Sequence, residues 1–99
     1  MIITNGYNVY PSTVEEATKR SRLVAACACI GVPDQIRGER IKIFIIPASG
    51  ATPRAIKKDL AKIYHQYLAK YETPRDFAFL DALPRTKLNK IDYLALGRL

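Results

Sequence analysis

The sequence predicts an α+β fold: a small, mostly antiparallel three-stranded sheet with two helices packed on it, preceded by an N-terminal β-hairpin. Three observations predict it. Asn5-Gly6 lies between two short runs of β-forming residues, residues 23–32 and 41–46 are two apolar runs separated by a turn, and residues 53–68 repeat apolar side chains at helical spacing. The order of these segments favours helices that cover one sheet rather than a bundle or a sandwich.

The N-terminal segment contains a hairpin signal and a helix-start signal. Asn-Gly suits a two-residue type I′ turn, because both central positions of that turn need a positive φ. Ser12 and Glu15 have the spacing of a capping box, in which the glutamate reaches back to the start of its helix. We therefore expect a hairpin followed by a short helix that ends near Ser21.

The central segment predicts two paired strands. Residues 23–32 carry no charge, which indicates a strand covered on both faces. Cys27 and Cys29 fall on one face of it and are expected to be reduced core residues, because neighbours at this spacing are poorly placed to bridge each other. Residues 41–46 are the expected antiparallel partner.

The C-terminal half predicts a long helix, a third strand and a polar loop. Thr52 and Pro53 suit the N-cap and first position of the helix. Residues 76–80 read as the third strand, residues 84–90 as the loop, and residues 91–99 as one or two final helical turns. With 99 residues the chain has enough length for one hydrophobic core, so residues 1–99 are expected to form one domain.

Net charge and hydropathy limit the possible binding partners and the cellular location of the protein. The net charge of +7 is compatible with a phosphate-rich small molecule, nucleic acid, an acidic protein surface, or solubility alone. No apolar run approaches the ~20 residues that span a bilayer, and residues 1–6 lack the features of a signal peptide. We expect a cytoplasmic protein with no membrane partner.

Three segments together resemble a known family. They are residues 1–11 with the Tyr10-Pro11 pair, residues 30–34 with Gly38 and Glu39 after them, and residues 83–92. The resemblance is to the C-terminal domain of the adenylate-forming superfamily, which comprises acyl-CoA synthetases, peptide-synthetase adenylation domains and luciferases. The Tyr-Pro form is most similar to that of acyl-CoA ligases.

Two positions depart from the family pattern. Asn89 stands where the family has glycine before its lysine, and Glu72 stands where the otherwise similar segment 71–75 has lysine. Asparagine tolerates left-handed backbone angles better than most residues, so the turn is expected to survive.

The resemblance implies the catalytic lid of an ATP-dependent acyl-CoA synthetase, which makes acyl-AMP from a carboxylic acid and then a CoA thioester. Lys90 would be the catalytic cation of adenylation. Gly6, Tyr7 and Asn8 would bind CoA, with Gly6 letting the pantetheine arm pass close to the backbone. The alternative, compatible with this role, is that glycine is present at position 6 only because the turn needs it. For the basic residues, contact with CoA phosphates and a solvated role both stay open; these are Arg37, Arg40, Arg75, Arg85 and Lys87.

The resemblance also implies a partner. The sequence contains no Ser/Thr/Gly-rich ATP-phosphate loop, so an N-terminal adenylating domain, in the same chain or as a split subunit, would bind most of ATP, its Mg²⁺, CoA and the carboxylic acid. No metal ligand is expected in residues 1–99, and the isolated domain is expected to be inactive.

Two alternatives come from other functional classes. One is a noncatalytic interaction module of the same fold. The other is an RNA-binding α+β domain, which needs aromatic residues on a central strand to stack bases. Residues 41–46 offer Phe44 alone, so we expect no nucleic-acid partner.

Overall fold

The computed structural model describes residues 1–99 and confirms the α+β class, with five strands in one sheet. No helix has the length and apolar character needed to cross a membrane. In chain order the elements are β1 (Ile2–Thr4), β2 (Tyr7–Val9), α1 (Pro11–Thr18), β3 (Val24–Asp34), β4 (Gly38–Pro47), α2 (Pro53–Tyr67), the 3₁₀ turn η1 (Lys70–Glu72), β5 (Asp76–Phe79) and α3 (Tyr93–Leu96).

The sheet is built around β4. Its antiparallel ladder with β3 runs from Val24 opposite Pro47 to Asp34 opposite Gly38. On its other side β4 pairs with β5 in parallel and with β1 through Thr4 and Gly38 alone. The mostly antiparallel three-stranded core with an added hairpin is therefore confirmed, and β3 is an outer strand with one neighbour.

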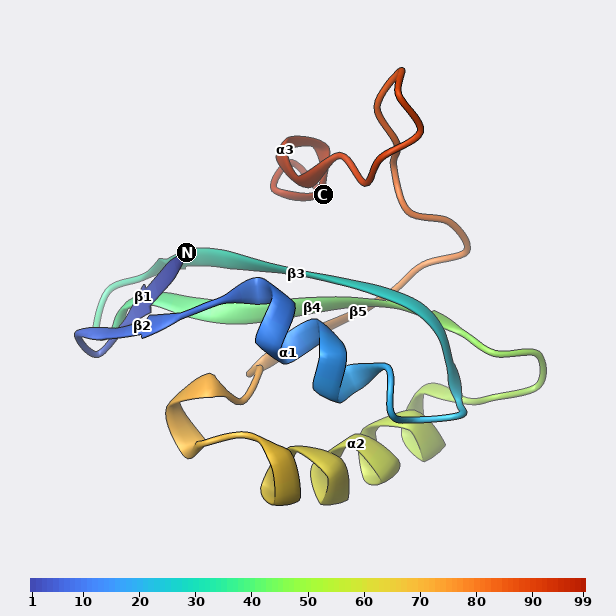
Figure 1. Ribbon diagram of the computed structural model, residues 1–99, viewed down its shortest axis with the longest axis horizontal. Coiled ribbons are helices and arrows are strands. Elements are labelled where there is room, and N and C mark those ends of the chain that lie inside the picture. Colours follow the sequence, from blue (N-terminus) through green and yellow to red (C-terminus); the bar gives the residue numbers. More distant parts are fainter.

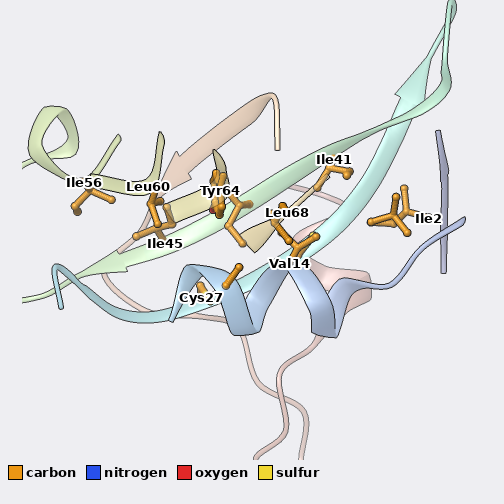
Figure 2. Packing of buried hydrophobic residues seen from close by; sticks show 13 residues of the cluster. Ile2, Val14, Cys27, Ile41, Ile45, Ile56, Leu60, Tyr64 and Leu68 are labelled. Carbon is orange, nitrogen blue, oxygen red and sulfur yellow. The ribbon is translucent and has the colours of Figure 1, made fainter. Parts of the chain in front are cut away.

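The sheet lies between two layers (Figure 1). Helices α1 and α2 cover one face, and the C-terminal segment with α3 lies over the other. The first face carries the main core, in which Figure 2 shows Val14 and Leu60 from the helices meeting Cys27 and Ile45 from the sheet. The buried members of the main core are Ile2, Val9, Val14, Ala17, Cys27, Cys29, Ile41, Ile43, Ile45, Ile56, Leu60, Tyr64 and Leu68.

A second cluster lies on the opposite face, where Ala28 and Phe44 of the sheet meet Leu83 and Leu96 of the C-terminal segment. Strand β3 thus contributes to both clusters, as its uncharged sequence predicts. Both cysteines are free and face the main core, as expected.

The predicted capping box at the start of α1 is wrong. Pro11 occupies the first position of the helix, Tyr10 is the N-cap, and no side chain caps the helix. Because the helix begins before Ser12, that residue cannot be its N-cap. The Glu15 carboxylate is turned instead toward β3, where it accepts a hydrogen bond from the Cys29 N–H at 2.9 Å.

Helix α2 begins as predicted. The Thr52 side chain accepts from the Ala55 N–H at 3.2 Å, and Pro53 follows it. The Tyr64 hydroxyl lies 2.7 Å from the Thr18 hydroxyl, which joins α2 to α1 in the buried layer. The exposed loops of this scaffold include the hairpin turn and the loop before α3.

Candidate functional site

Lys90 lies in a tight loop between β5 and α3. The Thr86 N–H donates to the Lys90 carbonyl at 2.7 Å, and Arg85 and Ile91 form an isolated antiparallel bridge. Asn89 adopts a φ of 63°, which confirms the left-handed conformation expected at this position. The backbone of Lys90 is thus fixed, whereas its exposed ammonium group forms no hydrogen bond or ion pair within the chain.

The hairpin turn carries Gly6. Asn5 and Gly6 have φ values of 53° and 81°, which confirms the two positive angles predicted for this turn. A Cβ placed on Gly6 would meet no atom within 4 Å, so backbone conformation requires glycine here and crowding within the chain does not. Tyr7 stacks on Tyr71 with ring centroids 4.3 Å apart, and Asn8 is exposed.

A basic hollow of about 230 Å³ lies beside this hairpin. It is lined by four cationic side chains and by no acidic one. Asn5 of the turn and Tyr71 of the aromatic stack both belong to its wall, so the hollow and the hairpin form one continuous surface. Its lining residues are Thr4, Asn5, Arg37, Arg40, Ile41, Lys70, Tyr71, Thr73 and Arg75.

Two of the four cations are anchored by carboxylates. Arg37 lies 3.2 Å from Asp34, and the Arg40 Nε donates to Asp76 at 2.8 Å. The backbone N–H groups of Arg37 and Ile36 donate to Asp34 and hold the pKa of that carboxyl below its ordinary value. Asp34 therefore stays ionised and keeps Arg37 in place.

The other two cations have no carboxylate partner. Lys70 begins η1, and Arg75 directly precedes β5, where its N–H donates to the Ile41 carbonyl at 3.0 Å. Neither forms a salt bridge. The hollow thus combines two preoriented guanidinium groups with two free positive charges, a composition that suits an anion such as phosphate.

The structure separates the predicted residues into two groups. Tyr7, Arg37, Arg40 and Arg75 gather around the hollow. Lys90 belongs instead to the C-terminal segment, which lies over the face of the sheet opposite α1 and α2 (Figure 1). Of the other loop cations, Arg85 donates to the Asn89 carbonyl at 3.3 Å and Lys87 is exposed.

Lys70 is a lining residue that sequence reasoning missed. It stands one position before segment 71–75, whose resemblance to the family was the available signal. No group of three or more His, Cys, Asp or Glu side chains is placed to hold a metal ion.

Comparison with known proteins identifies the family of this chain. Over residues 13–90 the sequence matches the family described as AMP-binding enzyme C-terminal domain, which accounts for most of the chain. The chain belongs to this family. As an AMP-binding C-terminal domain it is part of an enzyme family whose curated members include acid–thiol ligases.

Two curated relatives are CoA ligases. The long-chain-fatty-acid–CoA ligase of Bacillus subtilis is 37% identical over 91 residues, which are 92% of this chain and 16% of the relative. The feruloyl-CoA synthase of an Amycolatopsis species is 41% identical over 91 residues, which are 92% of this chain and 18% of that relative. The chain thus spans less than a fifth of the length of either.

Solved structures give the same result. The acyl-CoA synthetase of Brucella canis matches with a TM-score of 0.88 and 34% identity, covering 98% of this chain and 18% of that one. The amide bond synthetase of Marinactinospora thermotolerans matches with a TM-score of 0.90 and 31% identity, covering 98% and 19%. In both, the similar part is a small fraction of a much longer protein.

Proposed function

We propose that this AMP-binding C-terminal domain is the catalytic lid of an ATP-dependent acyl-CoA synthetase, with Lys90 serving adenylation and the hairpin around Gly6 serving thioester formation. The observation that carries the proposal is the unpaired Lys90 ammonium group on a backbone fixed from both sides. A surface lysine held in this way is ready to contact an anion supplied from outside the chain.

In adenylation, a carboxylate oxygen attacks the α-phosphorus of ATP, and pyrophosphate leaves to give acyl-AMP. The two reactants are both anions, so negative charge gathers where they meet. A positioned cation stabilises that charge in the transition state more than in the separated reactants. Lys90 supplies a compact charge on a long side chain, which suits contact with oxygens of both reactants.

In thioester formation, the CoA thiol attacks the acyl carbonyl carbon, and AMP leaves. The open space at Gly6 would let the pantetheine arm pass along the backbone, between Tyr7 and Asn8. The adjacent hollow would take phosphate groups of CoA, with Lys70 and Arg75 as its free charges. The position of the hollow would then determine where the pantetheine arm enters the active site.

The proposal requires a partner. An N-terminal adenylating domain, in the same chain or as a separate subunit, would hold the carboxylic acid and ATP with its Mg²⁺. The curated relatives support this, because the matched segment is only 16% of the Bacillus subtilis ligase.

The test is a chimera in which residues 1–99 replace the matched C-terminal part of the Bacillus subtilis ligase, assayed separately for each half-reaction. Lys90→Ala should slow pyrophosphate release by roughly a hundredfold, the scale of losing one preorganised electrostatic contact. It should leave thioester formation from supplied acyl-AMP nearly unchanged. Gly6→Leu should do the reverse, because its side chain would fill the path of the thiol.

Matched controls separate these effects from general damage. Lys87→Ala removes a charge from the same loop and should leave both half-reactions intact. Gly50→Leu places the same side chain at another open glycine, with φ of 79°, and measures the cost of backbone strain alone. A folded wild-type chimera that makes no acyl-CoA, or variants that slow both halves equally, would contradict the proposal and favour a noncatalytic module.

The RNA-binding alternative loses its one supporting residue. Phe44 is fully buried in the second cluster and cannot stack on a base. The C-terminal segment lies over that face of the sheet (Figure 1).

A further inference from the structure

Residues 81–99 leave the sheet after β5 and are joined to the rest of the chain by a single hydrogen bond. The last backbone bond to the sheet runs from the Leu80 N–H to the Ile45 carbonyl at 2.9 Å. Beyond it, the backbone hydrogen bonds close within the segment, such as Asp92 to Pro84 at 2.9 Å. The exception is the Tyr93 hydroxyl, which donates to the Glu15 Oε2 at 2.8 Å.

The acceptor atom has a second partner. The same Glu15 oxygen accepts from the Cys29 N–H at 2.9 Å, on the edge of β3 that has no neighbouring strand. Glu15 belongs to α1, which covers the opposite face of the sheet from α3 (Figure 1). Its carboxylate therefore reaches the sheet edge and joins the two layers there.

The donor lies close to the loop that carries Lys90. Tyr93 is the first residue of α3 and follows Lys90 by three positions. The chain between them is ordered, because the Asp92 N–H is bonded to Pro84 and its side chain accepts from the Ala95 N–H at 3.1 Å. Holding the Tyr93 hydroxyl thus fixes the direction in which the loop leaves the sheet.

Apolar contacts alone leave that direction less defined. Leu83 and Leu96 anchor the two ends of the segment in the second cluster, and Ile91 packs against that cluster between them. Such contacts are non-directional, and residues 85–90 are exposed. A hydrogen bond to a carboxylate is directional and stronger than one between neutral groups.

We propose that Glu15 and Tyr93 are positioning residues for Lys90. Their hydrogen bond holds the loop in the orientation that presents the ammonium group to the reacting anions. The inference rests on the proposed role of Lys90 in adenylation. Reaction rates are sensitive to such placement, since a displacement of ~1 Å can cost on the order of a hundredfold.

Three variants isolate the contact. Tyr93→Phe removes only the hydroxyl. Glu15→Ala removes the acceptor but also leaves the Cys29 N–H unpaired. Glu15→Gln keeps a side-chain oxygen that can accept both bonds and is the conservative rescue. Matched controls are Tyr10→Phe and Glu16→Ala, two exposed positions whose side chains form no hydrogen bond.

Amide hydrogen exchange on the 99-residue chain tests the tether without any activity. In Tyr93→Phe, the amides of Thr86, Asn89 and Asp92 should exchange roughly tenfold faster, while the β3–β4 ladder is unchanged. Glu15→Gln and both controls should behave as wild type. Wild-type exchange in Tyr93→Phe would overturn the inference.

Adenylation in the chimera then tests positioning. Tyr93→Phe and Glu15→Ala should lower kcat for pyrophosphate release by about tenfold, with KM for ATP unchanged and thioester formation intact. Glu15→Gln should retain most of the rate; a loss equal to that of Glu15→Ala would contradict a role as hydrogen-bond acceptor.

The two proposals fail differently. If Lys90→Ala abolishes adenylation while Tyr93→Phe keeps the wild-type kcat, the positioning role is wrong and the proposed function stands. If the folded wild-type chimera makes no acyl-AMP, the proposed function is wrong, and hydrogen exchange still decides whether Glu15 and Tyr93 hold the loop.

Discussion

Cys27 and Cys29 are expected to have low reactivity, although they lie on the same face of β3. Both thiols face the main core, and burial raises the pKa of Cys27 to about 11 and the pKa of Cys29 further. The Glu15 carboxylate nearby adds to both shifts. Because the thiolate is the reactive form, neither residue is suited to nucleophilic or redox chemistry at neutral pH.

These raised pKa values predict a loss of stability in alkali. Above about pH 9 an unfolded chain loses thiol protons that the folded chain retains, so the free energy of unfolding falls as pH rises, by up to ~1.4 kcal/mol per pH unit for each thiol. Urea denaturation at several pH values between about 8 and 10.5 measures this slope.

The control is the slope of a variant in which both cysteines are replaced by alanine. It should be flatter over this range, and any remaining slope belongs to the tyrosines, since burial also raises the pKa of Tyr93 to about 12. An unchanged slope would show that the thiols are not the cause.

Local signals predicted individual residues well where a backbone angle or a cap decides the conformation. Asn5-Gly6, Asn89 and Thr52 all adopt the conformations that their chemistry favours. The role of Glu15 was predicted wrongly, because a glutamate in a capping box and a glutamate bonded to a distant strand cannot be told apart from the sequence. Which of the two hydrogen bonds forms depends on how β3 packs against α1, and this is a property of the tertiary structure.

At the scale of elements, a glutamate on β4 helps to attach the hairpin to the sheet, together with the hydrogen bond from the Asn5 N–H to the Arg37 carbonyl at 2.9 Å. The Glu39 Oε1 accepts from the Ile3 N–H at 2.9 Å, and only Thr4 and Gly38 pair β1 with β4. Gly31 makes this possible: a Cβ there would lie 2.5 Å from the other Glu39 oxygen. The glycine leaves room for the carboxylate to pass.

Gly31→Ala should therefore destabilise the protein by about 1–3 kcal/mol, the cost of overpacking or of displacing Glu39 from its partner. Urea denaturation provides the measurement. In the Glu39→Ala background the carboxylate contact is gone and the Ile2 Cγ2, 3.0 Å from the added methyl group, is the remaining close neighbour, so the same substitution should cost less. Additive effects in this double-mutant cycle would contradict the coupling.

The strands and helices were largely predictable because each has its own periodicity or end signal. The docking of the hairpin on β4 was not, because it depends on a few contacts between residues far apart in the sequence: the Thr4–Gly38 pair, the Asn5–Arg37 hydrogen bond and the Glu39 contact. The parallel pairing of β5 with β4 likewise follows from the path by which α2 returns the chain across the sheet. The residues of β5 alone do not indicate that path.

At the scale of the whole molecule, the two proposed functional loops are exposed and separate, and neither forms an enclosed pocket. We expect the isolated chain to make no acyl-AMP. With ATP, Mg²⁺ and a panel of carboxylic acids, pyrophosphate release should not exceed that of Lys90→Ala. Release that depends on Lys90 would show that residues 1–99 complete an active site alone.

The family motifs identified Lys90 and Gly6 as residues of interest, but not their surroundings. The hollow beside the hairpin joins Arg37, Arg40, Lys70 and Arg75, which come from three separate parts of the sequence. Their convergence follows from the turn after β3, from η1 and from the start of β5 meeting at one end of the sheet. Only the fold brings such charges together.

The outer position of β3 has a consequence for self-association. A strand of 11 residues with one free edge offers unpaired N–H and C=O groups to a strand of another copy. Two features oppose such pairing: an irregularity between Val24 and Ala26, and the Glu15 carboxylate, which occupies the Cys29 N–H and places a negative charge on the edge. Removing that carboxylate would open the middle of the strand, so we expect Glu15→Ala to promote edge-to-edge association of this protein at high concentration.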